Sequence, residues 1–183
     1  MQALDFALRE CGLEDAPTLA LVGAATFLET YAGLLPAESI VWHTSTNHSA
    51  GAYEALLGKV DSRAWVAELP PTWAAGHGAP IGYAVLSAPD FAPELVGPGD
   101  LELKRIYAFS RFKGLGVGQK LFGAVLARAQ ERHAARLLLG VHRDNHRALA
   151  FYKRNGFLEV GTRQFRLGEN TFDDLVLGHV LQG

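Results

Sequence analysis

A glycine-rich loop at residues 113–118 is the feature of this 183-residue sequence that most constrains its fold. Lys113 is followed by Gly114, Gly116 and Gly118, so glycine occupies every second position of the loop. Glycine lets the backbone approach a ligand closely with its N–H groups turned outward, and at the start of a helix such a loop can hold a phosphate. The same glycines would also serve a tight turn and close helix packing. Either use requires a strand, this loop and a helix in succession.

The segments on either side of the loop have the expected periodicities. Residues 101–109 alternate as in a strand, but the apolar positions shift from odd to even numbers, which predicts a β-bulge near Lys104 or Arg105. After the loop, apolar residues fall on one face of a helix that runs to about His133, and an apolar strand follows at 137–141. This order predicts a parallel βαβ unit. The bulge should make the first strand diverge from its parallel neighbour and open a slot for a linear amide ligand.

The rest of the chain supplies elements that surround this unit. We expect strands at 6–9, 65–69, 81–86, 160–167 and 172–181, and helices at 15–33, 50–57 and 145–156. Gly58 is expected to end its helix in the left-handed conformation. Hairpins around one parallel unit predict a fold of the α/β class in the broad sense. Because the central sheet should be mixed and splayed, the fold is described more closely as α+β. Because we find no linker and no repeat, residues 1–183 are interpreted as one domain with its ligand-binding core at about 101–158.

Composition excludes several classes of function. Seventeen Lys and Arg are scattered among nineteen Asp and Glu, which argues against a nucleic-acid partner. No apolar run reaches 18 residues and the N-terminus does not resemble a signal peptide, so we expect no membrane partner and a cytoplasmic location. Cys11 is the only cysteine, which excludes an internal disulfide and a Cys-rich zinc site. His142 and His146 lack an evident third ligand, and we therefore expect no metal.

The loop does not fit the two commonest phosphate-binding motifs. A P-loop needs Gly-Lys-Ser or Gly-Lys-Thr, and neither occurs in the chain. In a dinucleotide-binding loop the third glycine would come one residue later, and the loop would follow the first strands of the chain. What remains is a ligand that contains a pyrophosphate group and is bound by a loop that follows a bulged strand.

Two segments resemble the acetyl-CoA-binding sequences of the GCN5-related N-acetyltransferase (GNAT) superfamily. Its usual signature is Gln or Arg, two residues, Gly, one residue, then Gly or Ala, and Lys113, Gly116 and Gly118 stand at those positions. Lys113 departs from the usual first residue and should adjust affinity only, because the loop acts through backbone amides. Residues 145–157 are similar to the family's Asn-x-x-Ala-x-x-Phe-Tyr-x-x-x-Gly-Phe segment at full spacing. The resemblance implies a GNAT-like acyl-CoA N-acyltransferase fold, with helices on both faces of the sheet, and acetyl-CoA as cosubstrate.

The resemblance also implies roles for individual residues. Backbone groups of Ile106, Tyr107 and Ala108 would bind the pantetheine arm, and Asn145 would contact the arm from the neighbouring strand's exit. Tyr152 would bind the cosubstrate and act as general acid. The pyrophosphate would lie against one continuous run, namely Lys113, Gly114, Leu115, Gly116, Val117, Gly118 and Gln119.

Acetyl transfer to a primary amine requires a proton acceptor. An amine with a pKa of about 10.4 must lose its proton, at a cost of about 4 kcal/mol at neutral pH, before it can attack a thioester. Glu102, beside the slot, is the first candidate for the base and Glu68 the second, either of them through water; both would also suit solvated strand positions. A tyrosine hydroxyl can give a proton to the departing thiolate. No covalent enzyme intermediate is required.

The acceptor is inferred from three further segments. Residues 26–31, 165–168 and 173–175 are similar to the corresponding stretches of PaiA-type spermidine/spermine acetyltransferases, a branch of the superfamily. Phe27 and Tyr31 would flank an aliphatic amine and Glu29 would meet a second ammonium, although a buried helix face explains these residues equally well.

We therefore expect an N-acetyltransferase that acts by direct attack on a small-molecule primary amine, with a polyamine as one candidate. A protein N-terminus or lysine is the alternative acceptor. A non-catalytic acyl-CoA-binding module is the alternative from another class, and Tyr152 argues against it. A two-fold homodimer is the default expectation for a soluble enzyme.

Overall fold

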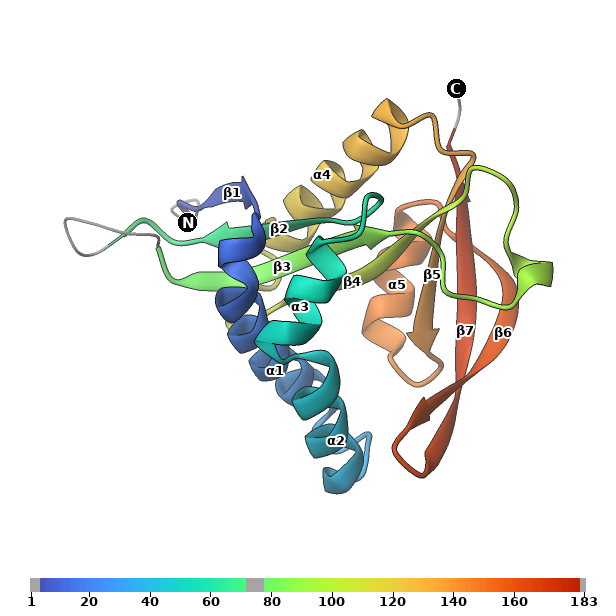
Figure 1. The fold of residues 1–183 in the computed structure, drawn as a ribbon, viewed down its shortest axis with the longest axis horizontal. Helices are drawn as coiled ribbons and strands as arrows, with labels where there is room; N and C mark the ends of the chain where they lie inside the picture. Colours follow the sequence, from blue (N-terminus) through green and yellow to red (C-terminus); the bar gives the residue numbers. More distant parts are fainter. Residues whose placement is uncertain (1–3, 72–77, 182–183) are drawn as a thin grey trace.

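The computed structural model describes residues 4–71 and 78–181, which form one mixed seven-stranded sheet flanked by helices (Figure 1). The strands lie in the order β1-β2-β3-β4-β5-β7-β6. Their bounds are β1 Ala7–Glu10, β2 Arg63–Glu68, β3 Pro80–Ser87, β4 Leu101–Ala108, β5 Arg136–His142, β6 Leu158–Leu167 and β7 Asn170–Val180. The helices of the described residues are α1 Ala16–Tyr31, α2 Ala37–Asn47, α3 Ala50–Leu57, α4 Val117–Glu131 and α5 His146–Arg154.

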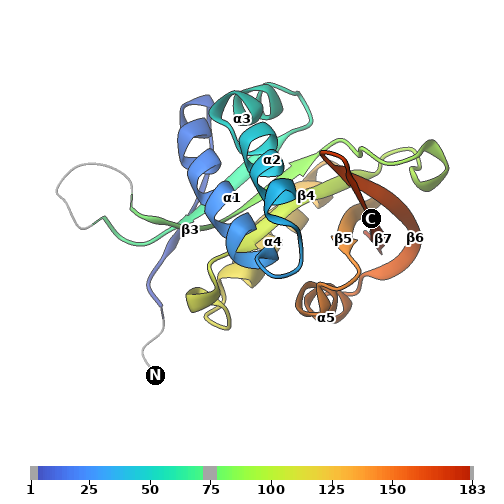
Figure 2. The same cartoon turned by 90° about the horizontal axis from the view of Figure 1, so that it is seen from below.

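The sheet is buried on both faces because its central strands carry apolar residues on both. Along β3, Tyr83 and Val85 pack with α1 and α3, whereas Ala84 and Leu86 pack in the cluster that contains the apolar face of α4. Figure 2 shows α1, α2 and α3 on one side of the sheet and α4 and α5 on the other. The predicted α+β fold with helices on both faces is confirmed.

The predicted bulge lies at Lys104. Val85 of β3 pairs with Arg105 and Leu86 pairs with Leu103, so Lys104 is the extra residue in β4. β4 and β5 run parallel, and among the described residues they pair only at Leu101 and Glu102. Beyond those two residues the strands separate, as the sequence predicted, and the sheet splays.

Glycines allow the chain to turn from β4 into α4. Gly114 and Gly116 have φ angles of +83° and +88°, in the left-handed region that L side chains rarely adopt. Gly116 is also the N-cap of α4, where no side chain occupies the N–H groups of the first helical turn. The loop therefore presents a row of backbone donors at the positive end of the helix dipole.

α5 follows β5 and begins and ends as the sequence predicted. The Asn145 side chain caps the helix by accepting a hydrogen bond from the Ala148 N–H at 3.2 Å. Gly156 ends it at a φ of +80°, and the Phe157 ring folds back to 5.6 Å from the ring of Tyr152. These contacts fix the direction in which α5 presents Tyr152.

In the first half of the chain, one helix was missed and one expectation was wrong. Helix α2 was not predicted, because its Ser, Thr and β-branched residues are weak helix formers. It forms through packing, with Ile40 buried against Phe27 and Leu167. Gly58 ends α3 with a φ of −69°, a right-handed conformation, so its position does not require glycine.

Candidate active site

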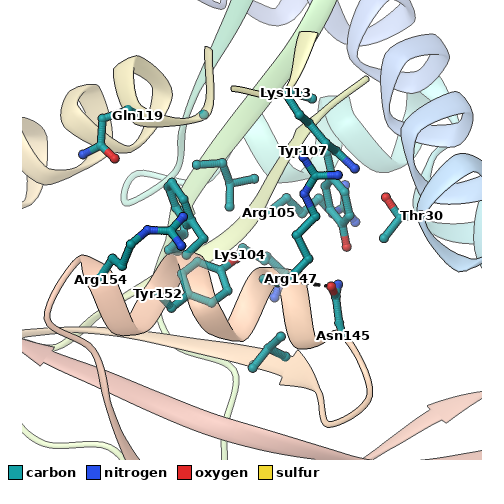
Figure 3. A pocket seen from close by; sticks show the side chains of 18 of the residues that line it. Thr30, Lys104, Arg105, Tyr107, Lys113, Gln119, Asn145, Arg147, Tyr152 and Arg154 are labelled. Atoms are coloured by element: carbon teal, nitrogen blue, oxygen red, sulfur yellow. Dashed lines mark hydrogen bonds between the residues drawn. The ribbon is translucent and has the colours of Figure 1, made fainter. Parts of the chain in front are cut away.

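The first of two adjoining cavities lies between β4, the glycine loop, β5 and α5, and has a volume of about 420 Å³ (Figure 3). It occupies the space that the splay between β4 and β5 opens. Of the residues assigned to the cosubstrate from the sequence, ten line this cavity: Ile106, Tyr107, Ala108, Lys113, Gly114, Gly116, Gly118, Gln119, Asn145 and Tyr152. The structure thus brings together the two motifs that are separated in the sequence.

Leu115 and Val117 are the members of the predicted run whose side chains do not line the cavity. Val117 is buried in the core beneath α4, and Leu115 is exposed. Both could reach a ligand only through their backbone groups, which is the kind of contact that the resemblance implies for this loop.

One end of the first cavity suits a diphosphate. A Cβ atom built on Gly114 or Gly116 would meet no other atom within 4 Å, so the backbone there is open to a ligand. Lys113 comes from the loop, and Arg147 and Arg154 come from α5, so cations face the backbone donors across the cavity. Burial and the neighbouring Arg147 lower the pKa of Lys113, against the opposing effect of Glu29. Backbone amides and cations together fit the diphosphate of coenzyme A.

Tyr152 faces the first cavity from α5. Its side chain is packed between Phe151 and Phe157, with ring centres 5.6 Å away in each case, and the residue is 8% exposed. Burial, and then the neighbouring Tyr31, raise the pKa of Tyr152. Its hydroxyl therefore stays protonated at neutral pH and can donate a hydrogen bond or a proton.

A second cavity, of about 180 Å³, adjoins the first. The two share the lining residues Tyr31, Lys104, Arg105, Tyr107 and Gly140. The remaining lining side chains come from α1, α2, the strands and three connecting segments: Phe27, Leu35, His43, Asn47, His48, Asp90, Glu102, His142, Arg163, Phe165, Leu167, Phe172 and Asp174. A ligand in the second cavity would thus lie next to one in the first.

Glu102 is the buried carboxylate of the second cavity. Its Oε2 accepts a hydrogen bond from the Asp90 N–H at 3.0 Å and lies 3.5 Å from the Lys104 Nζ. Burial raises the pKa of Glu102, in part offset by Lys104 and Arg163. The carboxyl therefore titrates closer to neutral pH than an ordinary glutamate does, as a proton acceptor requires.

Phe27 and Tyr31 reach the second cavity and Glu29 does not. Residues four apart share a helix face, and the Phe27 ring stacks on that of His43 with centres 4.1 Å apart. Glu29 points away from that face and lines neither cavity. Its carboxylate accepts hydrogen bonds from the N–H and hydroxyl of Ser110 at 2.8 and 2.6 Å, which lower its pKa despite the opposing effect of burial.

Glu68 lies away from both cavities. Its carboxylate accepts a hydrogen bond from Arg9 Nη2 at 2.9 Å, and the same guanidinium binds Asp15 at 2.7 Å. This ion-pair network joins β1 and β2 to the start of α1. Glu102 is therefore the one of the two predicted bases that the structure places beside a cavity.

Several cavity residues were not selected from the sequence. Arg105 lies on the predicted bulge, and that signal could have identified it, because a bulge turns two successive side chains to one side of a strand. His43, Arg163 and Asp174 come from distant segments and reach the second cavity only through tertiary packing. No local pattern marks them.

Two further predictions concern metals and membranes. Within residues 4–71 and 78–181, no group of three or more His, Cys, Asp and Glu side chains could hold a metal ion. His142 Nδ1 instead accepts a hydrogen bond from the Asp144 N–H at 3.2 Å. In the same part of the chain, the helices are too short or too polar to cross a membrane.

Comparison with known proteins relates the chain to acetyltransferases. The model of the acetyltransferase (GNAT) family matches residues 27–157. An uncharacterised N-acetyltransferase of Mycobacterium tuberculosis is 33% identical over 165 residues, which are 90% of this chain and 97% of that protein.

Solved structures share the fold. The PaiA N-acetyltransferase of Thermoplasma acidophilum, in complex with coenzyme A, superposes with a TM-score of 0.76 at 20% identity and covers 97% of this chain and 99% of its own. A GCN5-related N-acetyltransferase of Rhodopseudomonas palustris gives 0.75 at 20% identity, with 99% of each chain covered.

Proposed function

The chain belongs to the acetyltransferase (GNAT) family, and from this premise we propose that it transfers an acetyl group from acetyl-CoA directly to a primary amine of a small molecule. The observation that carries the proposal is the junction of the two cavities. A groove with backbone donors and cations at one end opens beside a smaller cavity that contains a buried carboxylate. Donor and acceptor would then meet at the shared wall of Tyr31, Arg105 and Tyr107.

The first cavity would hold two parts of coenzyme A. The loop at residues 113–119 would bind the diphosphate, and the unpaired edge of β4 at residues 106–108 would bind the pantetheine arm. Acetyl-CoA supplies a thioester whose acetyl carbon forms a bond to the amine nitrogen as the bond to sulfur breaks. The chain's residues position the reactants and move protons.

Two side chains would manage those protons. Glu102, whose pKa burial raises, would accept the proton of the amine directly or through water. Tyr152, which stays protonated, would give a proton to the departing sulfur. Glu102 lines the second cavity, where the amine would bind, and Tyr152 lines the first cavity, where coenzyme A would bind. Each side chain would therefore lie on the side of the reacting bond that its role requires.

The second cavity supports a small acceptor better than a protein segment. It measures about 180 Å³ and is lined by side chains from both halves of the chain. A polyamine would use Phe27 and Tyr31 as flanking rings, but Glu29 lies outside the cavity and would not meet its second ammonium. The polyamine is therefore one member of the amine class to be tested.

Three measurements with the purified protein test the proposal. Calorimetry should detect coenzyme A binding, and a thiol reagent should detect release of free coenzyme A when acetyl-CoA is mixed with a panel of small amines. Mass spectrometry should then identify the acetylated amine. Absence of coenzyme A binding would overturn the proposal, and acetylation of peptides alone would move the acceptor to the protein class.

A further inference from the structure

Arg105 is half-buried, and its positive charge has no anionic partner among the residues that the structure describes. Its side chain lines both cavities, and its Cζ lies 4.8 Å from the centre of the Tyr53 ring. Its Nη1 is buried without a hydrogen-bond partner, and in the described part of the chain no carboxylate forms an ion pair with it. A buried cation in this state is costly unless a ligand supplies the anion.

The groups around Arg105 do not supply that anion. Burial, followed by the charge of Arg105, lowers the pKa of His43 to about 4, and the same two causes lower the pKa of His48 to about 2. Both rings are therefore neutral at pH 7. Tyr53 and Tyr107 are also neutral, because burial raises the pKa of each hydroxyl.

The other charges of the second cavity are already matched. Arg163 binds Asp174 at 3.2 Å. Lys104 lies 3.5 Å from Glu102 and 3.5 Å from Asp90, so one ammonium serves two carboxylates. Within residues 4–71 and 78–181, this pairing leaves Arg105 without an anionic partner, and Glu102 shares the Lys104 ammonium with Asp90.

The bulge in β4 places these two groups on one cavity. In a regular strand, residues three apart point to opposite faces. The extra residue at Lys104 shifts the phase by one, so Glu102 and Arg105 both line the second cavity. Glu102 lines only the second cavity, whereas Arg105 lines both cavities.

We infer that the acceptor is a zwitterion, an amine that also carries a carboxylate, as in an α-amino acid. Its carboxylate would bind the guanidinium of Arg105, where two parallel N–H···O bonds are possible, and its amine would face Glu102. This assignment rests on the proposed function. It also weighs against a polyamine, since the unpaired guanidinium of Arg105 would repel a second ammonium.

Matched acceptor pairs test the inference with the wild-type enzyme. Each pair contains an amino acid and the amine that lacks its carboxylate, such as lysine with cadaverine and phenylalanine with phenethylamine. The amides of the same amino acids and spermidine are measured beside these pairs. Free coenzyme A release gives kcat/KM for each acceptor, and calorimetry gives coenzyme A binding independently. We expect at least one amino acid to exceed its decarboxylated partner and its amide by about 10- to 100-fold, the value of one charge-assisted hydrogen bond to a buried site.

Variants of Arg105 identify the group responsible. Arg105→Gln should remove the preference by raising KM for the amino acid, and Arg105→Lys, which keeps the charge, should restore part of it. Arg166→Gln is the matched control, because Arg166 is exposed on β6, lines neither cavity and should leave both constants unchanged. Coenzyme A binding and circular dichroism show whether each variant is folded. If Arg105→Gln does not fold, the wild-type acceptor pairs still decide the question.

The outcomes separate the inference from the proposed function. If the protein binds coenzyme A and acetylates decarboxylated amines or spermidine as well as amino acids, the zwitterion is wrong and the acetyltransferase proposal stands. If it binds coenzyme A and acetylates no amino acid, the inference is equally overturned. If it does not bind coenzyme A, both fail. An amino-acid preference that survives in Arg105→Gln would overturn the role of Arg105.

Discussion

The two cavities are built from different parts of the chain. The glycine loop and the separated edge of β4 form most of the first cavity, so its recognition groups are largely backbone N–H and C=O groups. The second is lined by side chains, among them Glu102, Arg105 and His43, from elements far apart in the sequence. Under the proposed function, the difference implies that a fixed backbone geometry would recognise the cosubstrate, while the acceptor would be chosen by side chains that can change without altering that geometry.

The largest effect is expected for Tyr152→Phe, which should lower turnover without changing the affinity for coenzyme A. Tyr152→Phe removes the proton donor but keeps the ring that packs on Phe151 and Phe157. Turnover should fall about 100-fold or more, in the range of general acid catalysis, while coenzyme A affinity stays nearly unchanged. Steady-state kinetics and calorimetry check the two quantities. Equal turnover in the two proteins would remove Tyr152 as the acid.

Gly116→Val tests whether backbone geometry holds the cosubstrate. A β-branched residue is strained at a φ of +88°, and relief of that strain should displace the N–H groups at the start of α4. Coenzyme A affinity should fall about 10- to 100-fold in calorimetry, by the strain together with a lost charge-assisted bond.

Gly123→Val provides the control for this change. Gly123 is exposed within α4, and a Cβ atom there meets nothing within 4 Å. If both variants bind coenzyme A equally well, the first cavity does not depend on the loop conformation.

Glu102→Gln tests the side chain that would accept the proton. Because burial raises the pKa of Glu102, its proton-accepting form is lost as the pH falls through that raised value. In the wild type, kcat/KM should therefore decline on the acidic side, with a midpoint above about 4.3, the ordinary glutamate pKa. The variant should lose this decline and be about ten-fold slower at neutral pH, since water can partly replace the base.

A matched exposed glutamate controls for the loss of charge. Glu159→Gln, on β6, should keep both the rate and the pH profile of the wild type. If Glu102→Gln keeps the decline of kcat/KM at acidic pH, that decline belongs to the titration of another group.

The smallest effect is expected at Lys113, the residue that departs from the usual family signature. Its side chain lines the first cavity and is half-buried, so solvent screens part of its charge. Lys113→Met should weaken coenzyme A binding about two- to five-fold, and the difference should shrink as salt is added. Lys153→Met, on the exposed side of α5, should have no effect. A loss as large as that of Gly116→Val would mean that side chains, not backbone, dominate the first cavity.

The contrast between the cavities also explains what the sequence could predict. The glycine loop, the phase shift at Lys104 and the cap at Asn145 are local patterns, and each predicted a feature that the structure contains. Most residues assigned to the cosubstrate line the first cavity for that reason. Their roles in binding and catalysis stay predictions.

The acceptor side depended on packing that no local pattern records. Helix α2, which brings His43 to Phe27, was not predicted because its residues have weak helix propensity. Glu29 was placed near Phe27 and Tyr31 from sequence proximity, but its position on α1 turns it toward Ser110. Side chains such as Arg163 and Asp174 belong to strands whose register is fixed only when β6 and β7 pair.

The extra residue in β4 has a consequence for how such an enzyme can diversify. One inserted position, Lys104, both parts the strand from β5 and turns Arg105 into the acceptor cavity. A deletion there would close the groove and turn the guanidinium to the other face of the sheet in a single event. Under the proposed function, an exchange of the side chain at position 105 would instead change the acceptor and leave the groove for the donor as it is.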